Sequence, residues 1–337
     1  MKIRSIYFAF AALFLLAGVF GKAQAQTVSD YKISAPFNYK NLTIFLIHGK
    51  DQTNKKNILT LEEAMENKEF VVYETSDVNE LAVENLSKTN DVFIQSGDIV
   101  KGGQQDRLLA VSIIIPANSG KVLIAAFCVE SGRWAKRGGE DKGQFSSSNE
   151  RIVSRDLKIA ANISRSQSEV WSEVSNVQQK LSENVGGSVN STKSETSLQL
   201  SLEDKKVREN IDRYISNLGK IIEGKKDVIG YAFAINGKIN SADVYVSNSL
   251  FKKLWLKMLK ASATEAVANL NEKTKTEKVN AADVKTFLSD SEKGKSREET
   301  VSKRTKVITR EDETNIVFEA MDEKAKLIVH KSYVKKQ

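Results

Sequence analysis

Asp91–Trp134 reads DVFIQSGDIVKGGQQDRLLAVSIIIPANSGKVLIAAFCVESGRW and alternates apolar runs with two polar turns. Three of its runs are rich in β-branched residues and predict strands: Asp91–Gln95, Arg107–Ile115 and Lys121–Glu130. The first turn is residues 97–107, and the second is residues 128–134. Because both turns would border strands of one β-structure, this stretch predicts the N-terminal fold and a candidate site together.

The residues before this stretch extend the β-rich part to residue 42. Leu42–His48 is short, apolar and closed by Gly49, as a strand would be. Thr60 and Glu63 have the spacing of a capping box, which predicts a short helix to Asn67. Two further runs predict strands: Phe70–Thr75 and Leu81–Asn85. Residues 42–134 therefore predict an antiparallel sheet or sandwich.

After residue 155 the apolar period changes from two to that of a helix. Val170, Val174, Val177 and Leu181 fall on one helical face. Further helices are expected over residues 203–222 and from about 249 to 269. Between them Asn236-Gly237 predicts a hairpin of the strands Val228–Ile235 and Lys238–Val246. Residues 155–270 thus predict helices around a hairpin.

The last part of the chain begins with a charged segment, residues 271–314, that we expect to be partly mobile apart from a short helix over Ala282–Leu288. Asn315–Ala320 and Lys326–Tyr333 predict a closing hairpin within residues 315–334, and its strands need a partner. We therefore expect them to return to the earlier sheet. The predicted fold is α+β, with residues 42–334 forming a single domain and residues 26–41 a lead-in segment.

Residues 1–25 have the features of a cleavable signal peptide. Lys2 and Arg4 precede the apolar run Ile6–Phe20, and Ala23-Gln24-Ala25 matches a small-residue cleavage site. The alternative is an uncleaved anchor helix, although the run is short for a span of about 20 residues. No later stretch is long and apolar enough to cross a membrane. The sequence therefore predicts an exported protein, periplasmic or secreted.

The charge balance argues against a nucleic-acid partner. Removal of residues 1–25 lowers the Lys and Arg count from 51 to 48 against 43 acids, which leaves a net charge of +5. Lys and Glu are interspersed along the chain, whereas nucleic-acid binders concentrate basic residues in a patch.

The first polar turn, GDIVKGGQQDR, predicts a candidate ligand cradle. Asp98, Lys101, Gln104 and Arg107 offer both signs of charge beside Gly102-Gly103, which allows close backbone approach. The alternative is a long hairpin loop whose glycines serve only turn geometry. The turn lacks the spacing of a phosphate-binding loop.

The second polar turn holds Cys128, Glu130, Arg133 and Trp134. Arg133 would bind an anionic group and Trp134 would stack on a ligand. The alternative is a Glu130–Arg133 pair that closes the turn, with Cys128 and Trp134 in the core. Thiol catalysis would need a histidine, and of the only two, His48 and His330, the second is the candidate partner. The spacing of Cys and His predicts no metal site, and no cofactor is indicated.

The residues of both turns also resemble a known family. GDIVKGGQQDR and CVESGRW resemble its two signatures, residues 231–266 resemble its hairpin–helix segment, and LIVHKSY at 327–333 resembles its closing strand. The family is the ARG and rhodanese-phosphatase-superfamily-associated protein domain. Asp98 stands where the family has Glu, and residues 185–200 carry an insertion. The resemblance implies that both turns share one surface, and it implies no activity.

The leading functional hypothesis is a non-catalytic ligand-binding or accessory module. Lys101, Arg107 and Arg133 would hold a small anionic or polar ligand between the two turns. Substituting both arginines should then abolish binding with little change in stability. A protein partner in the cell envelope is a second kind of ligand. The alternative hypotheses are a hydrolase using Glu130, Asp98 or a Cys128–His330 pair, and a structural protein that associates with itself.

Overall fold

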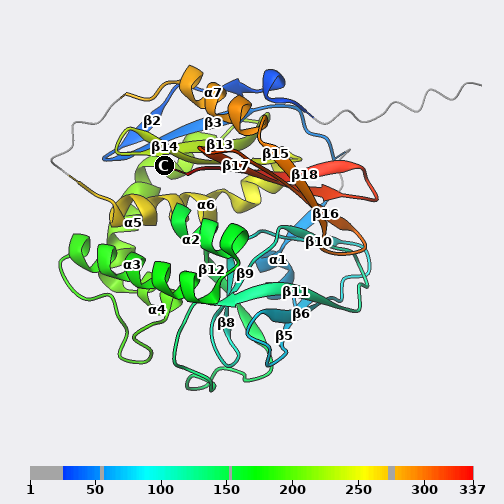
Figure 1. The fold of residues 1–337 in the computed structure, drawn as a ribbon, viewed down its shortest axis with the longest axis vertical. Helices are drawn as coiled ribbons and strands as arrows, with labels where there is room; N and C mark the ends of the chain where they lie inside the picture. The colour runs from blue at the N-terminus through cyan, green and yellow to red at the C-terminus, as the bar shows by residue number, and fades with distance from the viewer. Residues whose placement is uncertain (1–25, 54–56, 152–153, 272–277, 337) are drawn as a thin grey trace, which may run out of the picture.

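The computed structural model describes residues 26–53, 57–151, 154–271 and 278–336 (Figure 1). The chain is α+β, as the sequence predicts, and the described residues form three β-sheets with helices packed on them. The signal-peptide prediction falls on residues 1–25, outside the described residues, so that prediction and export remain untested. Among the described residues, no helix has the length and apolar character needed to cross a membrane.

The largest sheet joins the N-terminal and C-terminal parts of the chain. Its order is β1-β3-β13-β14-β18-β17-β16-β15, with β2 paired to β3. The bounds of its strands are β1 Lys32–Ile33, β2 Phe37–Tyr39, β3 Leu42–His48, β13 Val228–Ile235, β14 Lys238–Tyr245, β15 Lys295–Thr300, β16 Thr305–Glu311, β17 Asn315–Asp322 and β18 Leu327–Lys335. The predicted return of the closing hairpin to the sheet is confirmed, because β18 pairs with β14.

Both faces of this sheet are covered. Leu42, Ile44 and Leu46 of β3 pack in a cluster with helix α6 (Asn248–Ala268), whereas Phe45 and Ile47 pack toward α7 (Ala281–Ser291). Figure 1 shows α7 above the sheet and α6 below it. A strand buried on both faces has a nearly continuous apolar sequence. The run LTIFLIH accordingly forms an interior strand of the sheet, between β1 and β13.

Local signals predicted the turn and cap positions correctly. Asn236 and Gly237 both have positive φ, 51° and 75°, and join β13 to β14 as the predicted hairpin requires. Helix α1 (Leu61–Glu66) begins after the Thr60 cap, and the Thr60–Glu63 capping box is present.

Residues 58–151 form two smaller sheets rather than one with β3. β4 (Ile58–Thr60), β7 (Asp91–Ile94) and β10 (Ile113–Ile115) make a three-stranded sheet in which β4 and β7 are parallel. The six-stranded sheet has the order β12-β8-β9-β11-β6-β5. Its bounds are β5 Phe70–Glu74, β6 Glu80–Asn85, β8 Asp98–Gly102, β9 Arg107–Leu109, β11 Lys121–Cys128 and β12 Phe145–Arg151.

Two local predictions in this region were wrong. The predicted strand Arg107–Ile115 is divided into β9 and β10, which belong to different sheets. The predicted first turn is shorter than residues 97–107, because Asp98–Gly102 is the strand β8. Ile99 and Val100 are buried in two different apolar clusters, so these residues serve the core rather than a loop.

The remaining helices lie on the same side of the large sheet as α6 or beside the six-stranded sheet (Figure 1). They are α2 Arg155–Ile159, the one-turn π-helix η2 Ala160–Ser164, α3 Gln167–Val185, α4 Leu198–Leu202, α5 Lys205–Leu218 and the 3₁₀ turn η3 Gly219–Ile222; a further 3₁₀ turn, η1, covers Val28–Asp30. The predicted helices over 170–184, 203–222 and 249–269 correspond to α3, α5 with η3, and α6.

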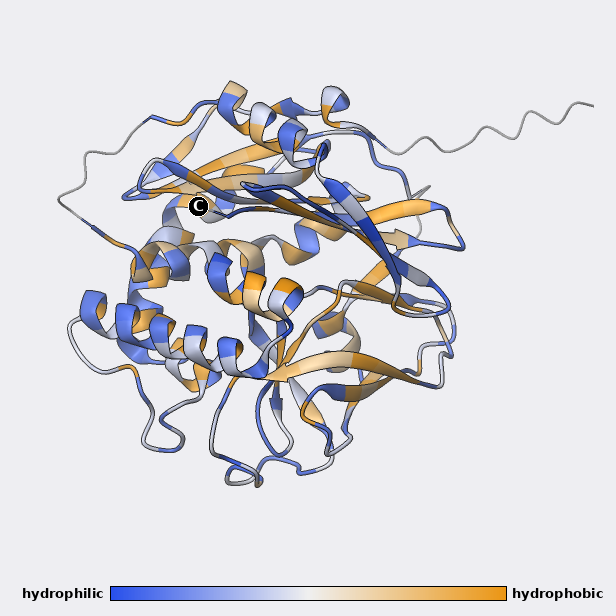
Figure 2. Ribbon diagram, in the orientation of Figure 1, coloured by the Kyte–Doolittle hydropathy of each residue, from blue (hydrophilic) through white to orange (hydrophobic). Residues whose placement is uncertain are grey.

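The charged segment 271–314 contains more regular structure than predicted. α7 is longer than the expected helix, and β15 and β16 extend the large sheet beyond β17. Residues 272–277 lie outside the described residues. Figure 2 shows the hydrophilic character of β15, whose side chains are all exposed. A composition poor in apolar residues does not predict such a strand, because its backbone bonds to β16 need no buried side chains.

Candidate functional site

The two predicted polar turns lie against each other. β9 pairs with β11, which places Arg107 opposite Cys128. The backbone N–H of Asp106 donates to Glu130 Oε2 at 3.1 Å, and the side-chain amide of Gln105 donates to the Glu130 carbonyl at 2.8 Å. The turns therefore form one region, as the family resemblance implies.

An ionic cluster of Asp106, Glu130, Arg133, Arg137 and Glu140 fills the space between the turns. Arg133 binds both oxygens of Glu130, at 2.7 Å from Nε and 2.6 Å from Nη2. Arg137 binds both oxygens of Asp106 at 2.9 Å and Glu140 at 2.9 Å. Asp106 and Glu130 are 0% exposed. Paired arginine–carboxylate bonds of this kind are strong and directional.

Two groups of the cluster, Glu130 and Arg137, have pKa values shifted toward the charged form. Burial acts to raise the pKa of Glu130, but the hydrogen bonds from Arg133, Ser194 and the Asp106 amide outweigh it and hold the pKa below its usual value. Burial acts to lower the pKa of Arg137, and Asp106 and Glu140 raise it overall. Arg133 and Arg137 thus share three carboxylates within the cluster.

Arg107 is also neutralised by the protein. Its guanidinium donates to Glu74 Oε1 at 3.2 Å and to the Val78 carbonyl at 2.7 Å. It lies 5.7 Å from the ring centre of Trp134, which is 46% exposed and covers it from solvent. Trp134 therefore stacks on an arginine of its own chain.

The other predicted side chains of the first turn have partners as well. The pairs are Asp98 with Lys257 at 3.1 Å, Lys101 with Glu203 at 2.8 Å and Gln104 with Ser76 at 2.9 Å. An anion entering between the turns would compete with a carboxylate already bound to each predicted cation. Ligand binding by the turns remains a prediction, and their contacts give them a structural role.

Cys128 does not form the hypothesised pair with His330. Its side chain is 0% exposed, and its Sγ lies 3.9 Å from the Val78 carbonyl. Burial raises the pKa of the thiol to about 11, so the group is protonated at neutral pH. A nucleophilic cysteine needs the opposite shift. His330 instead bonds to other residues, described below.

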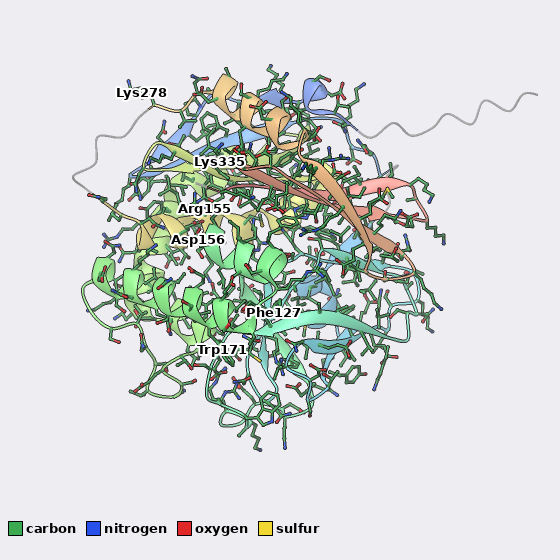
Figure 3. The ribbon with its side chains drawn as sticks, viewed as in Figure 1. Phe127, Arg155, Asp156, Trp171, Lys278 and Lys335 are labelled. Carbon is green, nitrogen blue, oxygen red and sulfur yellow. The ribbon has the colours of Figure 1, made fainter. Side chains whose placement is uncertain are left out.

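A cavity of about 270 Å³ lies elsewhere, between β11, the outer strands of the large sheet and the α2–η2 segment. Leu123, Ala125 and Phe127 alternate along β11 and share the face toward it. Figure 3 shows Phe127 at the end of β11 that lies near α3. Leu123 is 57% exposed, so the cavity has an apolar lip open to solvent.

The opposite wall is one face of the large sheet. Strand register places two rows of side chains across it, Val307–Ala320–His330 and Thr309–Phe318–Ser332. The first row continues to Tyr245 and the second to Asp243 on β14. Because alternate residues of a strand face the same side, these groups are brought together by register alone.

His330 links a hydroxyl group at the cavity to a buried carboxylate. Its Nδ1 lies 3.1 Å from Ser112 Oγ, and its Nε2 lies 2.9 Å from Asp243 Oδ1. A carboxylate at this distance assigns the ring proton to Nε2, which leaves Nδ1 to accept from Ser112. Gln95 approaches Nε2 at 3.4 Å, a longer contact. Tyr245 stacks on the ring at 4.8 Å and fixes its plane.

Lys158 lies beside the hydrogen-bonded residues Ser112, His330 and Asp243. It is 8% exposed, lines the cavity, and its Nζ donates to Ser332 Oγ at 3.2 Å. Burial lowers the pKa of Lys158, and Asp243 opposes that effect. Burial acts to raise the pKa of Asp243, but Lys158, His330 and Arg151 together hold it below its usual value.

The stability of the protein should depend on pH through His330. Burial lowers the pKa of His330, although Asp243 acts to raise it and Lys158 and Arg151 lower it further. Ser112, Gln95 and Tyr245 complete its surroundings. Below about pH 6.5 the unfolded chain protonates this histidine while the folded chain does not, so the unfolding free energy should fall with falling pH, by at most about 1.4 kcal/mol per pH unit.

Urea denaturation between pH 5 and 8 measures this dependence, because the slope of unfolding free energy against pH reports the proton that His330 binds in the unfolded state but not in the folded one. In the His330→Gln variant, the part of the slope of unfolding free energy against pH that is due to His330 should disappear. An unchanged slope in the variant would contradict the assignment to His330.

Sequence reasoning missed most of this second region. Ser112 lies in an apolar run, Asp243 in a hairpin strand and Lys158 at the start of a helix, and none has a local motif. The one available signal was His330 with Ser332, two residues apart on a predicted strand. Among the residues that the structure describes, no group of three or more His, Cys, Asp or Glu is placed to hold a metal ion.

Comparison with known proteins agrees with the resemblance of the turn sequences. The profile of the ARG and Rhodanese-Phosphatase-superfamily-associated Protein domain, ARPP-1, matches residues 30–334. The chain therefore belongs to the ARPP-1 family. No curated protein and no solved structure is significantly similar to it.

Proposed function

We propose that this ARPP-1 protein binds a small amphiphilic molecule in the cavity between β11 and the large sheet. The apolar part of the ligand would contact Leu123, Phe127 and Phe318. Its anionic or polar head would contact Lys158 and Ser332. The cavity, about 270 Å³, is slightly smaller than the usual range for ligand pockets, roughly 300–1,000 Å³, which suits a small ligand.

The observation that carries the proposal is the buried ammonium group of Lys158. An ammonium group has three N–H donors. Within the described residues Nζ makes a single hydrogen bond, to Ser332 Oγ, and the side chain lines the cavity. Burying a cation is costly unless it is paired and hydrogen-bonded. A ligand oxygen at Nζ would supply a bond that the protein itself does not.

This proposal keeps the ligand-binding hypothesis but places the ligand in the cavity instead of between the two polar turns. The cations of the two turns already bind carboxylates of the chain, whereas Lys158 retains donor capacity at a cavity. The sequence of residues 1–25 supports export, so we propose that the ligand is met in the periplasm or outside the cell.

Hexanoate is a suitable probe, because it combines a short apolar chain with one carboxylate. Calorimetric titration of the full chain should show binding, and Lys158→Met should weaken it by about 10- to 100-fold, as expected for a hydrogen bond to a charged group. Ala320→Leu should remove binding, because Ala320 lies in the cavity wall between Val307 and His330.

Lys101→Met is the matched control. Lys101 belongs to the turn region and binds Glu203. The cavity proposal expects its hexanoate affinity to equal that of the unchanged protein. Loss of binding in Lys101→Met, with binding retained in Ala320→Leu, would place the ligand at the turns and overturn the proposal.

A further inference from the structure

We propose that Ser112 is a nucleophile for acyl transfer and that this cavity hydrolyses esters of short apolar acids. The proposal rests on the proposed binding site, because the same cavity would hold the acyl chain. It goes beyond ligand binding, because it specifies a reaction, ester hydrolysis, and a reacting atom, Ser112 Oγ.

The hydrogen bonds at Ser112 have the arrangement of an activated hydroxyl. Ser112 Oγ lies 3.1 Å from His330 Nδ1, and the opposite nitrogen of the ring lies 2.9 Å from Asp243. A nucleophile, a base and a group that orients the base form the constellation used for acyl transfer on unrelated folds. In the serine protease triad Nε2 of the histidine faces the serine hydroxyl, whereas here Nδ1 of His330 faces it.

Ser112, His330 and Asp243 differ in solvent exposure as the reaction requires, because only the nucleophile has to reach the substrate. Ser112 is partly exposed and lines the cavity, whereas His330 and Asp243 are 2% and 1% exposed. Burial lowers the pKa of His330, so the imidazole is neutral near pH 7 and can accept a proton. The Ser96 N–H donates to Ser112 Oγ at 3.0 Å and holds the hydroxyl in place.

The protein offers groups for each part of an ester substrate. The acyl chain would lie between β11 and the sheet wall, against Phe127 and Phe318. Lys158 lines the same cavity and carries the charge that stabilises a developing oxyanion. Asp243 acts as a positioning residue, because it touches His330 rather than the substrate.

The reaction balances with water as the only co-reactant. Ser112 Oγ bonds to the ester carbonyl carbon while its proton moves to His330 Nδ1. The tetrahedral intermediate collapses, the bond to the alkoxide breaks, and His330 returns the proton to give the alcohol. Water then attacks the acyl-serine, loses a proton to His330, and releases the carboxylic acid as Ser112 regains its proton. Ester and water give acid and alcohol.

The test is hydrolysis of p-nitrophenyl hexanoate by the full chain. Ser112→Ala should reduce the rate to background, and Asp243→Asn should lower kcat by about 10²- to 10⁴-fold with little change in KM. Ser146→Ala is the matched control, because Ser146 is an exposed serine on β12, and its rate should be unchanged. A fluorophosphonate probe, which forms a P–O bond with loss of fluoride, should label the peptide that contains Ser112.

Hexanoate titration of Ser112→Ala separates the two proposals. Retained hexanoate binding in this variant, together with lost turnover, is the expected result. If hexanoate binds but the unchanged protein neither hydrolyses the ester nor reacts with the probe at Ser112, the nucleophile proposal is overturned and the binding proposal stands. If hexanoate does not bind and the ester is not hydrolysed, both are overturned.

Discussion

The Glu130→Ala variant should lose about 3–5 kcal/mol of unfolding free energy, the range found when one partner of a buried ion pair is removed. Arg133 and Arg137 are 13% and 8% exposed at their side chains, and Glu130 is the nearest carboxylate of the first and a neighbour of the second. The variant also removes the acceptor of the Asp106 N–H. Urea denaturation at pH 7 measures the loss.

Glu299→Gln provides the comparison, because Glu299 pairs with Arg165 where both side chains are about half exposed. Exposed pairs contribute roughly 0–1 kcal/mol, so this variant should be nearly as stable as the unchanged protein. If the two turns served only to bind a ligand, substitutions in the cluster should abolish binding and leave the stability unchanged. A loss below about 1 kcal/mol in Glu130→Ala would favour that reading, since it would match an exposed pair.

The parts of the fold that sequence predicted are those decided by neighbouring residues. The Thr60–Glu63 capping box needs only two residues three positions apart, and the Asn236-Gly237 turn needs only the ability of two residues to adopt positive φ. The apolar period of α3 is likewise local. In each case the energy that selects the structure lies within a few residues.

The division of Arg107–Ile115 was not predictable in this way. The run is apolar apart from Arg107 and Ser112, but Leu108 and Leu109 pair with β11, whereas Ile113–Ile115 pair with β7. β9 also pairs with the nearby β8, but its pairing with β11 and the pairing of β10 with β7 join residues far apart in the sequence. β15 shows the converse case, in which backbone pairing makes a strand from a sequence with no apolar residue.

The candidate site shows the same difference between residues placed by local sequence and residues placed by long-range pairing. Arg107, Glu130 and Arg133 could be brought together from sequence, because their turns border strands expected to pair. Arg137 could not, since it follows in a polar segment without periodicity. Ser112 and His330 are 218 residues apart, and His330 and Asp243 are 87 apart. The pairing of β14 with β18 brings His330 and Asp243 to one face of the large sheet, and the segment between β9 and β10 places Ser112 against that face.

The Asp243→Ala variant should be destabilised by about 1–3 kcal/mol, since it removes the acceptor of the buried His330 Nε2–H and the negative charge that offsets the burial of Lys158. Asp243 and Lys158 both line a small void between α2 and β14, and each shifts the pKa of the other toward the charged form. Lys158→Met keeps most of the side-chain volume and removes the charge. The double variant should therefore be more stable than the sum of the single losses predicts, with a coupling of about 0.5–3 kcal/mol.

Urea denaturation of the four proteins at pH 7 gives this coupling directly. Phe287→Ala and Asp243→Ala form the additive comparison, because Phe287, a residue of α7, packs on the opposite face of the sheet. Additive losses for Asp243 and Lys158 as well would mean that Lys158 is stabilised by something other than Asp243. The measurement also bears on the cavity: if the pair is coupled, Asp243 fixes both the ammonium group that would bind the ligand head and the imidazole that would activate Ser112.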